Sequence, residues 1–517
     1  MKRISLIVLF LLTLFATTVC AQRYRGSDTA APAASPNGTR GVKAACQHPA
    51  LNVTAEAADG SIKLTLIDRR QNYNFSERET LDNNINSPKS VNISPDNSKF
   101  YVNSLEGATT VVYDLKTKQR LKVIKHQFDS VRDAQLWAPP SGLFKFTHYT
   151  DRNPNHFFGK PVEATFSHDG RYLWVPYYRR DFDINAQDPS AVAVIDTKTD
   201  EIIRLMETGP LPKMICTSPD DKYIAISHWG NNTVGLVNIE SDDPNEWKYE
   251  RVLVVDQVLP LNFPLHVSVD RDNNSGYALR GTVFTPDGHY LLVGCMGSGG
   301  GIAVIDMHSG KYLGRVTGMM PNVRHLVIFD HWLYLSVNAA GMVQRMDIGQ
   351  FIKVAQTMNG ESVKTAQASG WENAKVGAGA RTIELSPDGR FVFAACNLAS
   401  RICVVDTRTM RQVLEIPADS YPVGLAISCD GHYLISTSQG RNHVGGNCVD
   451  IYRIDYKEEP VILAKAERDT TVVATNEEPG SLPTTLQGAG SWTIGGIVAL
   501  LIILLTAFGI YCKRKKE

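Results

Sequence analysis

The sequence predicts an all-β fold, a seven-bladed β-propeller with a cleaved signal peptide at one end and a single transmembrane helix at the other. Three observations predict it. A turn motif recurs seven times, a second polar residue follows each turn, and an apolar segment lies at each end of the chain. Repetition of one short β unit is typical of propellers.

The composition is that of a globular protein with added segments. The 517 residues are 43% hydrophobic and 21% charged, so the chain is neither a disordered polyion nor wholly embedded in a membrane. Basic and acidic residues balance at 53 each. A chain without net charge lacks the global attraction to nucleic acids, and we expect no nucleic-acid partner.

The first residues have the features of a secretory signal. Lys2 and Arg3 precede an apolar run, which ends at the small-residue site Val19-Cys20-Ala21. We therefore predict a cleaved signal peptide over residues 1–21. Residues 22–49, rich in Ala, Ser, Gly and Pro, are expected to form a disordered lead.

The other end carries a predicted membrane anchor over residues 492–512. Trp492 to Tyr511 contains no charged residue and is long enough, at about 1.5 Å per residue, to cross roughly 30 Å of hydrocarbon. The basic tail 513–517 is expected to stay in the cytoplasm. The rest of the chain would then lie on the periplasmic or extracellular side of the cytoplasmic membrane.

Residues 466–491 are rich in Thr, Glu, Gly and Pro and predict a flexible stalk. Within them, Leu482-Pro483-Thr484-Thr485 resembles a sortase sorting signal, but Leu486 stands where a glycine is expected. We therefore expect simple retention in the membrane.

A tight-turn motif divides the middle of the chain into repeats. Most copies read Ser or Thr, then a variable residue, then Asp, then Gly or Asn, between an apolar and an alternating stretch. Two strands joined by a short Asp-Gly turn have this pattern. The seven turns begin at Ser94, Ser167, Ser218, Thr285, Phe329, Ser386 and Ser428.

A second polar residue closes a β-rich run after each turn, at Asp114, Asp196, Asn238, Asp306, Asp347, Asp406 and Asp455. Such side chains accept hydrogen bonds from the main chain of the following turn, after which a fourth strand is expected. Seven units of four strands predict a propeller over residues 50–465. Apolar residues at helical spacing predict a short helix within residues 348–376.

These repeats also resemble a known family. The strings Ala193 to Thr199 and Val404 to Thr409, each paired with one of the turns, are similar to the YVTN or YncE-like prokaryotic seven-bladed propellers over about residues 85–460. The resemblance implies a bacterial or archaeal origin. It implies little about function, because that family includes redox partners, surface proteins and ligand binders.

One repeat position gathers positive charge. Counting five residues back from each turn gives Lys89, Val162, Lys213, Arg280, Arg324, Arg381 and Val423. We call the five basic members of this column the basic ring. On the first strand of each blade they would converge at one mouth of the channel, where like charges favour an anionic ligand.

The same column has a second interpretation, in which the basic side chains bond carbonyls and carboxylates of neighbouring blades and fasten the propeller. Glu163 is one candidate carboxylate. Loops at residues 128–160, 177–189, 258–277 and 438–446 are expected to emerge at the same mouth. They and their neighbours would provide a recognition rim that includes Tyr177, Tyr178, Arg179, Arg180, His228 and Trp229.

We predict a membrane-anchored binding or scaffolding module whose partner is an anionic small molecule or an acidic protein segment. The alternative is an enzyme. The segments around Arg324-His325 and Arg381 resemble the Gly-Pro-Arg-His strand starts of lactonase-type seven-bladed propellers. That resemblance implies that Arg324, His325 and Arg381 handle a lactone, with Glu163 as a candidate acid or water-orienting group. No recognisable metal or cofactor motif is found, so we expect neither.

Overall fold

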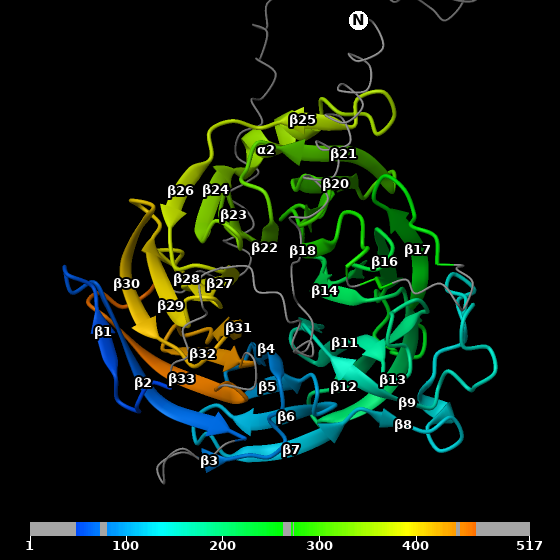
Figure 1. Cartoon of the computed structure of the whole chain (residues 1–517), viewed down its shortest axis with the longest axis horizontal. Coiled ribbons are helices and arrows are strands. Elements are labelled where there is room, and N and C mark those ends of the chain that lie inside the picture. Colours follow the sequence, from blue (N-terminus) through cyan, green and yellow to red (C-terminus); the bar gives the residue numbers. More distant parts are fainter. Residues whose placement is uncertain (1–47, 73–79, 262–269, 272, 441–444, 462–517) are drawn as a thin grey trace, which may run out of the picture. The chain divides into compact units, whose positions relative to one another are not determined.

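The protein is described by a computed structural model over residues 48–72, 80–261, 270–271, 273–440 and 445–461, which belong to one compact unit. These residues form seven sheets around a central axis (Figure 1). The predicted all-β, seven-bladed fold is confirmed. In each blade four strands pair antiparallel, and the first strand lies nearest the axis.

The first three blades follow one another along the chain. Blade 1 contains β4 (Pro88–Ile93), β5 (Lys99–Ser104), β6 (Thr109–Asp114) and β7 (Arg120–Lys125). Blade 2 contains β10 (Thr165–Ser167), β11 (Tyr172–Arg180), β12 (Ser190–Asp196) and β13 (Glu201–Thr208), with β8 (Gln127–Phe128) and β9 (Phe157–Pro161) added. Blade 3 contains β14 (Pro212–Thr217), β15 (Tyr223–His228), β16 (Thr233–Asn238) and β17 (Lys248–Val254).

Four further blades complete the circle. Blade 4 contains β18 (Leu279–Phe284), β19 (Tyr290–Cys295), β20 (Ile302–Asp306) and β21 (Lys311–Thr317), and blade 5 contains β22 (Val323–Phe329), β23 (Trp332–Val337), β24 (Met342–Asp347) and β26 (Glu372–Lys375). Blade 6 contains β27 (Ala380–Leu385), β28 (Phe391–Cys396), β29 (Arg401–Asp406) and β30 (Arg411–Pro417). Blade 7 contains β31 (Pro422–Ile427), β32 (Tyr433–Ser438), β33 (Cys448–Tyr456) and β2 (Ile62–Gln71), with β1 (Thr54–Glu56) and β3 (Thr80–Leu81) beside β2.

The predicted turns are held by their own side chains. In blade 6 the Ser386 hydroxyl donates to Asp388 Oδ1 (2.7 Å) and accepts from the Phe391 main-chain N–H (3.0 Å). This pair of bonds recurs at the turns that begin at Ser94, Ser218, Thr285 and Ser428. The hydroxyl thus satisfies polar groups that the turn takes out of the ladder, which explains why the motif needs both Ser or Thr and Asp.

The second polar residue caps the next turn, as predicted. Asp196 Oδ1 accepts from the Lys198 N–H at 2.8 Å and Asp406 Oδ1 accepts from the Arg408 N–H at 2.7 Å. In blade 5 the equivalent Asp347 accepts from the Gln350 N–H and caps a helix, α2 (Ile348–Ala355). The predicted short helix is therefore confirmed.

Closure of the circle differs from the prediction. The sequence predicted a fourth strand after Asp455, but that position in blade 7 is filled by β2, which pairs with β33 from Ile62↔Tyr456 to Gln71↔Cys448. An early strand thus completes the last blade, so the two ends of the described chain meet in one sheet. In blade 5 the fourth strand is likewise displaced, because α2 and β25 (Thr365–Gln367) come before β26, and β25 pairs with β21 of blade 4.

The hydrophobic core lies in layers between adjacent blades. Between blades 2 and 3, the buried Trp174 of β11 approaches Trp247 with ring centroids 5.3 Å apart. Such large interleaved side chains hold neighbouring blades at a fixed angle.

The predicted terminal segments lie outside the described residues. These are the signal peptide (1–21), the transmembrane helix (492–512) and almost all of the lead and the stalk. Within the part that the structure describes, no helix has the length and apolar character needed to span a membrane.

Candidate functional site

Each member of the basic ring lies at a β-bulge in the first strand of its blade. Pro88 pairs with Ser104 and Ser90 with Asn103, so Lys89 is the extra residue between them. Similar interruptions occur at Lys213, Arg280, Arg324 and Arg381. A bulge removes one residue from the ladder and redirects its side chain. Five blades therefore make the same local departure at a basic residue.

The basic ring is buried. The exposed fractions of its five residues range from 1% to 5%, the lowest at Lys213 and Arg381 and the highest at Arg324. The side chains are not spread into bulk water. Burial of several like charges near one axis is costly unless negative or aromatic groups compensate.

Near the basic ring, adjacent blades are connected by hydrogen bonds from side-chain hydroxyls to main-chain carbonyls. The Ser90 hydroxyl of blade 1 donates to the carbonyl of Val162 in blade 2 at 2.6 Å. Equivalent bonds run to the carbonyls of Arg280, Arg381 and Val423, each from the preceding blade. Main-chain carbonyls at this repeat position therefore accept hydrogen bonds from the neighbouring blade. In the second interpretation, contacts between blades were expected from the basic side chains instead.

Two predicted rim residues surround Lys213. Its ammonium lies 4.0 Å from the ring centroid of Tyr178 and 4.9 Å from that of Trp229. Both rings are almost fully buried. Tyr178 and Trp229 therefore contribute cation–π contacts to one member of the ring.

The other predicted rim residues include three whose side chains are inside the protein. Tyr177 is fully buried, and its hydroxyl contacts Nδ1 of His126 at 2.9 Å. Arg180 packs against the ring of Phe157, and His228 contacts the Thr208 hydroxyl at 2.8 Å. The expectation that Tyr177, Arg180 and His228 form an open rim is wrong. Tyr177 belongs to the core layer that includes Phe157, and a bulge between Tyr177 and Arg180 lets Arg180 pack on the same Phe157 ring.

His325 lies next to the basic ring and is neutral at physiological pH. Burial, together with the positive charges of Arg280 and Arg324, lowers the pKa of His325 to about 4. Its Nδ1 accepts the main-chain N–H of Ile383 in blade 6 at 3.4 Å. The neutral ring then carries its proton on Nε2, which is a donor.

A second ionisable group in the first strands was not predicted. Burial and, to a smaller extent, the negative charge of Glu163 together raise the pKa of Glu384 to about 8. Glu384 lies on β27, the strand of blade 6 nearest the axis, and its side chain is partly exposed. This is expected for a side chain that lines the channel. At neutral pH it is mostly protonated and can donate a hydrogen bond or a proton.

The inner strands and the residues just before them carry two groupings: Arg280 and Arg324 act on His325, and Glu163 acts on Glu384. Cations, a neutral imidazole and a protonated carboxyl all donate hydrogen bonds, so each suits a ligand with acceptor oxygens. A raised carboxyl pKa close to a second carboxyl is also the pattern expected for an acid and a base in one site.

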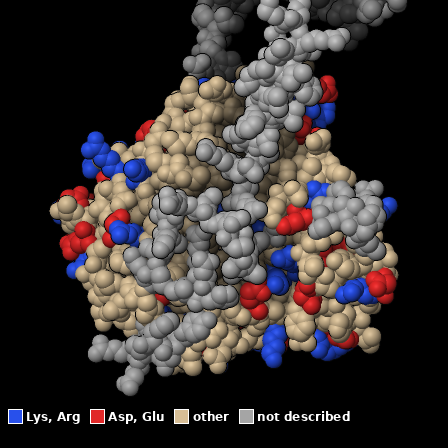
Figure 2. Space-filling view, viewed as in Figure 1, with Lys and Arg blue, Asp and Glu red and all other residues tan. Residues whose placement is uncertain are grey.

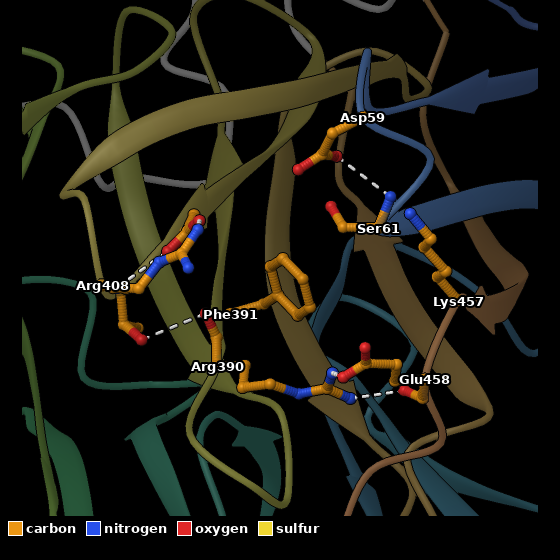
Figure 3. Close-up of a pocket in the computed structure, with 9 residues that line it drawn as sticks. Asp59, Ser61, Arg390, Phe391, Arg408, Lys457 and Glu458 are labelled. Atoms are coloured by element: carbon orange, nitrogen blue, oxygen red, sulfur yellow. Dashed lines mark hydrogen bonds and ion pairs between the residues drawn. The ribbon is translucent and has the colours of Figure 1, made fainter.

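A different hollow, of about 310 Å³, lies between blade 6 and the β1–β2 turn (Figure 3). Two of its charged residues already have partners. Arg390 donates to the main-chain oxygen of Glu458 at 2.6 Å, and Asp59 accepts from the Ser61 N–H at 3.0 Å. We assign it no ligand. Among the described residues, no three His, Cys, Asp or Glu side chains are grouped to hold a metal ion.

Outside the channel the charges are mixed. On the face seen in Figure 2, basic and acidic side chains are interspersed around the periphery. This mixture agrees with the equal numbers of the two kinds in the sequence.

Residues 158–468 match the sequence profile described as "Lactonase, 7-bladed beta-propeller". The chain belongs to this lactonase seven-bladed propeller family. The match covers blades 3 to 6, the four main strands of blade 2 and strands β31, β32 and β33 of blade 7, and it includes His325, Glu384, Glu163 and four members of the basic ring.

Other comparisons add less. No curated protein matches the chain. Among solved structures, the β-propeller domain of Cps50 (Swd1) from Myceliophteria thermophila is similar over 71% of this chain and 96% of that chain, with 12% sequence identity and a TM-score of 0.47. Membership of the lactonase family therefore comes from the sequence profile alone.

Proposed function

We propose that the channel mouth binds an anionic ligand through the basic ring. The observation that carries this is the repetition of a basic residue at the same bulge in five blades. A bulge that served only to bend the strand would not need a cation, since Val162 and Val423 occupy the same repeat position.

The ligand is a small carboxylate or phosphate, or an acidic protein segment. Charge-assisted hydrogen bonds from guanidinium groups are short and strong, and they are stronger still where water is excluded. An anion would also relieve the mutual repulsion of the cations.

The binding test uses purified protein titrated with citrate, inorganic phosphate and an oligoglutamate peptide. Arg324→Gln and Arg381→Gln should each weaken binding of the active probe by about tenfold or more, because a charge-assisted hydrogen bond is lost. Arg408→Gln is the matched control, since its side chain is 85% exposed beside Asp406, away from the channel. Equal affinity in all three variants would refute the proposal.

The second candidate function is lactone hydrolysis, which two specific observations favour: the family match and the raised pKa of Glu384. In this reaction the Glu163 carboxylate takes a proton from water as the oxygen attacks the lactone carbonyl. Arg324 and Arg381 stabilise the negative oxygen that forms. Protonated Glu384 then donates its proton to the ring oxygen as the carbon–oxygen bond breaks, which gives the open hydroxy acid.

Hydrolysis is tested with a panel of lactones against the purified protein. Glu384→Gln and His325→Ala should remove turnover, because neither variant keeps the proton donors in place. A protein that binds the hydroxy acid product but shows no turnover above that of the variants is a binding module. That outcome would exclude the enzyme and leave anion binding intact.

We also propose that the protein is exported and held at the outer side of the cytoplasmic membrane, as the signal peptide and the apolar segment 492–512 suggest. Protease treatment of intact cells should digest the propeller and leave a membrane-bound fragment that contains the basic tail. Full protection would contradict the proposal.

A further inference from the structure

Two buried cysteines face one another inside blade 6. Cys396 ends β28, Cys403 lies on the neighbouring β29, and both are thiols in this structure. The Cys396 S–H is directed at the sulfur of Cys403, and the two Sγ atoms are 3.7 Å apart. Both residues are fully buried and belong to the same hydrophobic cluster. The two sulfurs are therefore in direct contact, away from solvent.

Strand pairing places the two side chains on one face of the sheet, where β28 and β29 lie side by side (Figure 1). Cys403 pairs with Ala394, two residues before Cys396, so the cysteines are diagonal neighbours across the ladder. A disulfide needs sulfurs about 2.05 Å apart and β-carbons that point toward one another. The two sulfurs, 3.7 Å apart, would have to approach by about 1.7 Å to form the bond.

The main chain of Gly377 packs directly on this pair. A Cβ atom at Gly377 would lie 2.9 Å from Cβ and 3.2 Å from Sγ of Cys396, closer than side chains normally approach. Glycine permits a close contact of this kind because it has no side chain. The segment that leads into blade 6 therefore covers the two sulfurs without a side chain that would hold them apart.

The contact makes the two thiols unequal. The hydrogen bond from Cys396 lowers the pKa of Cys403 despite burial, and the Gly377 N–H and the charge of Arg401 act in the same direction. The same hydrogen bond and burial raise the pKa of Cys396. Since the thiolate is the form that attacks a disulfide, Cys403 is the thiol that reacts first.

Blade 4 offers a natural comparison. Cys295 ends β19 as Cys396 ends β28, and it is also fully buried. Ala303 of β20 occupies the place that Cys403 has in β29, as the two strand registers show. Blade 4 therefore has a buried thiol at the same position but no second thiol at the diagonal position.

We propose that Cys396 and Cys403 are a dithiol site that becomes a disulfide when the protein folds in the presence of a disulfide oxidant. The Cys403 thiolate attacks one sulfur of the oxidant R–S–S–R, which forms a mixed disulfide and releases R–S⁻. Cys396 then loses its proton and attacks Cys403 Sγ, which releases the second R–S⁻. The two thiols lose two electrons and two protons in total, and the oxidant is reduced to two R–SH.

Burial decides when the reaction takes place. Both sulfurs are enclosed once blade 6 has packed, so the oxidant reaches them while the blade is still open. Compartments outside the cytoplasm supply such oxidants, and the disulfide is therefore expected in the cell only if the chain is exported as proposed. Formation of the bond in the purified protein depends neither on export nor on what the channel binds.

The test refolds the purified full-length protein from urea in a buffer of reduced and oxidised glutathione. Remaining thiols are then labelled with iodoacetamide in fresh urea, and the protein is digested with trypsin. Cleavage after Arg390, Arg401 and Arg408 places the two cysteines on separate peptides. Mass spectrometry should find peptides 391–401 and 402–408 joined by a disulfide, and reduction should separate them.

Two controls accompany this experiment. Cys403→Ala is the matched variant, because it gives blade 6 the residue that blade 4 has at this position, and it should leave Cys396 labelled as fully as Cys295. A sample kept unfolded in the same buffer shows how much pairing comes from closeness in sequence alone. It should contain several-fold less of the joined peptides than the refolded protein.

Circular dichroism shows whether each sample is folded, and size exclusion isolates the folded fraction before labelling where refolding is incomplete. The proposal is overturned if Cys396 and Cys403 of the folded protein are labelled as fully as Cys295. It is also overturned if either is joined to a different cysteine, or if the unfolded sample contains as much of the joined peptides.

Discussion

Closure of blade 7 depends on a buried ion pair between β2 and β33. Arg69 Nε lies 2.5 Å from Asp450 Oδ1, and both side chains are fully buried. Arg69 also donates to the carbonyl of Pro49 at 3.0 Å. Burial alone would lower the pKa of Arg69, but the negative charge of Asp450 raises it overall. We predict that Arg69→Met strongly destabilises the propeller.

The magnitude follows from what the substitution leaves behind. Without Arg69, the contacts that remain to Asp450 from the described part of the chain are long, a 3.3 Å bond from the Asp419 N–H and a 3.5 Å bond from the Tyr452 hydroxyl. Removal of one partner from a buried pair costs about 3–5 kcal/mol, because the remaining charge is uncompensated. In the double variant Arg69→Met, Asp450→Leu no charge is left, and we expect at least half of the loss to be recovered.

The assay is urea unfolding followed by circular dichroism, carried out as a double-mutant cycle at two pH values. Burial already raises the pKa of Asp450 in the natural protein, and Arg69 acts against this rise. In Arg69→Met the folded-state pKa must therefore rise further, so stability is retained at low pH and lost as pH rises through the folded pKa. The deficit relative to the natural protein should therefore shrink on acidification. A loss below about 1 kcal/mol, or additive effects in the cycle, would refute the reasoning.

Three further predictions concern other parts of the propeller. Glu384→Gln should gain stability relative to the natural protein as pH rises from about 4.5 to 8, because a carboxyl with a raised folded pKa destabilises the fold progressively over that range; parallel pH profiles in urea would contradict this. Deletion of residues 48–72 removes β2 and should abolish cooperative unfolding, whereas a sharp transition would show that six complete blades suffice. Ser386→Ala should cost about 1 kcal/mol, since Phe391 N–H and Asp388 lose their partner, and an unchanged urea midpoint would argue against that role of the turn hydroxyl.

The blade architecture was predictable because its signals are local. The turn at Ser386 needs a hydroxyl and an Asp two residues later, and both bonds are made within six residues of chain. Asp196 and Asp406 likewise act on their own neighbours. Because the hydrogen bonds that end each strand are made by residues close in sequence, one sequence is enough to count these strands.

Closure was missed because its signal is not local. β2 pairs with β33 across nearly the whole chain, and β2 has neither the turn motif nor the capping residue of the repeats. The alternation of apolar residues in β2 predicts a strand, but it does not predict which strand β2 pairs with. A count of strands after Asp455 could have raised the question, because the last repeat lacks one.

The candidate site was predictable only in part. The column five residues before each turn led to the basic ring, since a bulge recurs at a fixed place in the repeat. Glu384 lies two residues before its turn, and the residues at that position in the other blades carry no charge. Comparison of that column would have found it. Burial of Tyr177 could not be predicted, because the loop beside it gave no sign of which face of β11 it covers.

Attachment of blades through carbonyls at the bulges has a consequence for engineering. A carbonyl is common to all twenty amino acids, so a bond from Ser336 or Thr382 to it survives whatever side chain the bulge carries. The charge at the channel mouth can then be changed one blade at a time. Substitution by valine is a natural choice for a neutral variant, because Val162 and Val423 already occupy this repeat position. Selectivity for ligands of another charge could then be engineered by substitution at this one repeat position, without a change in the propeller fold.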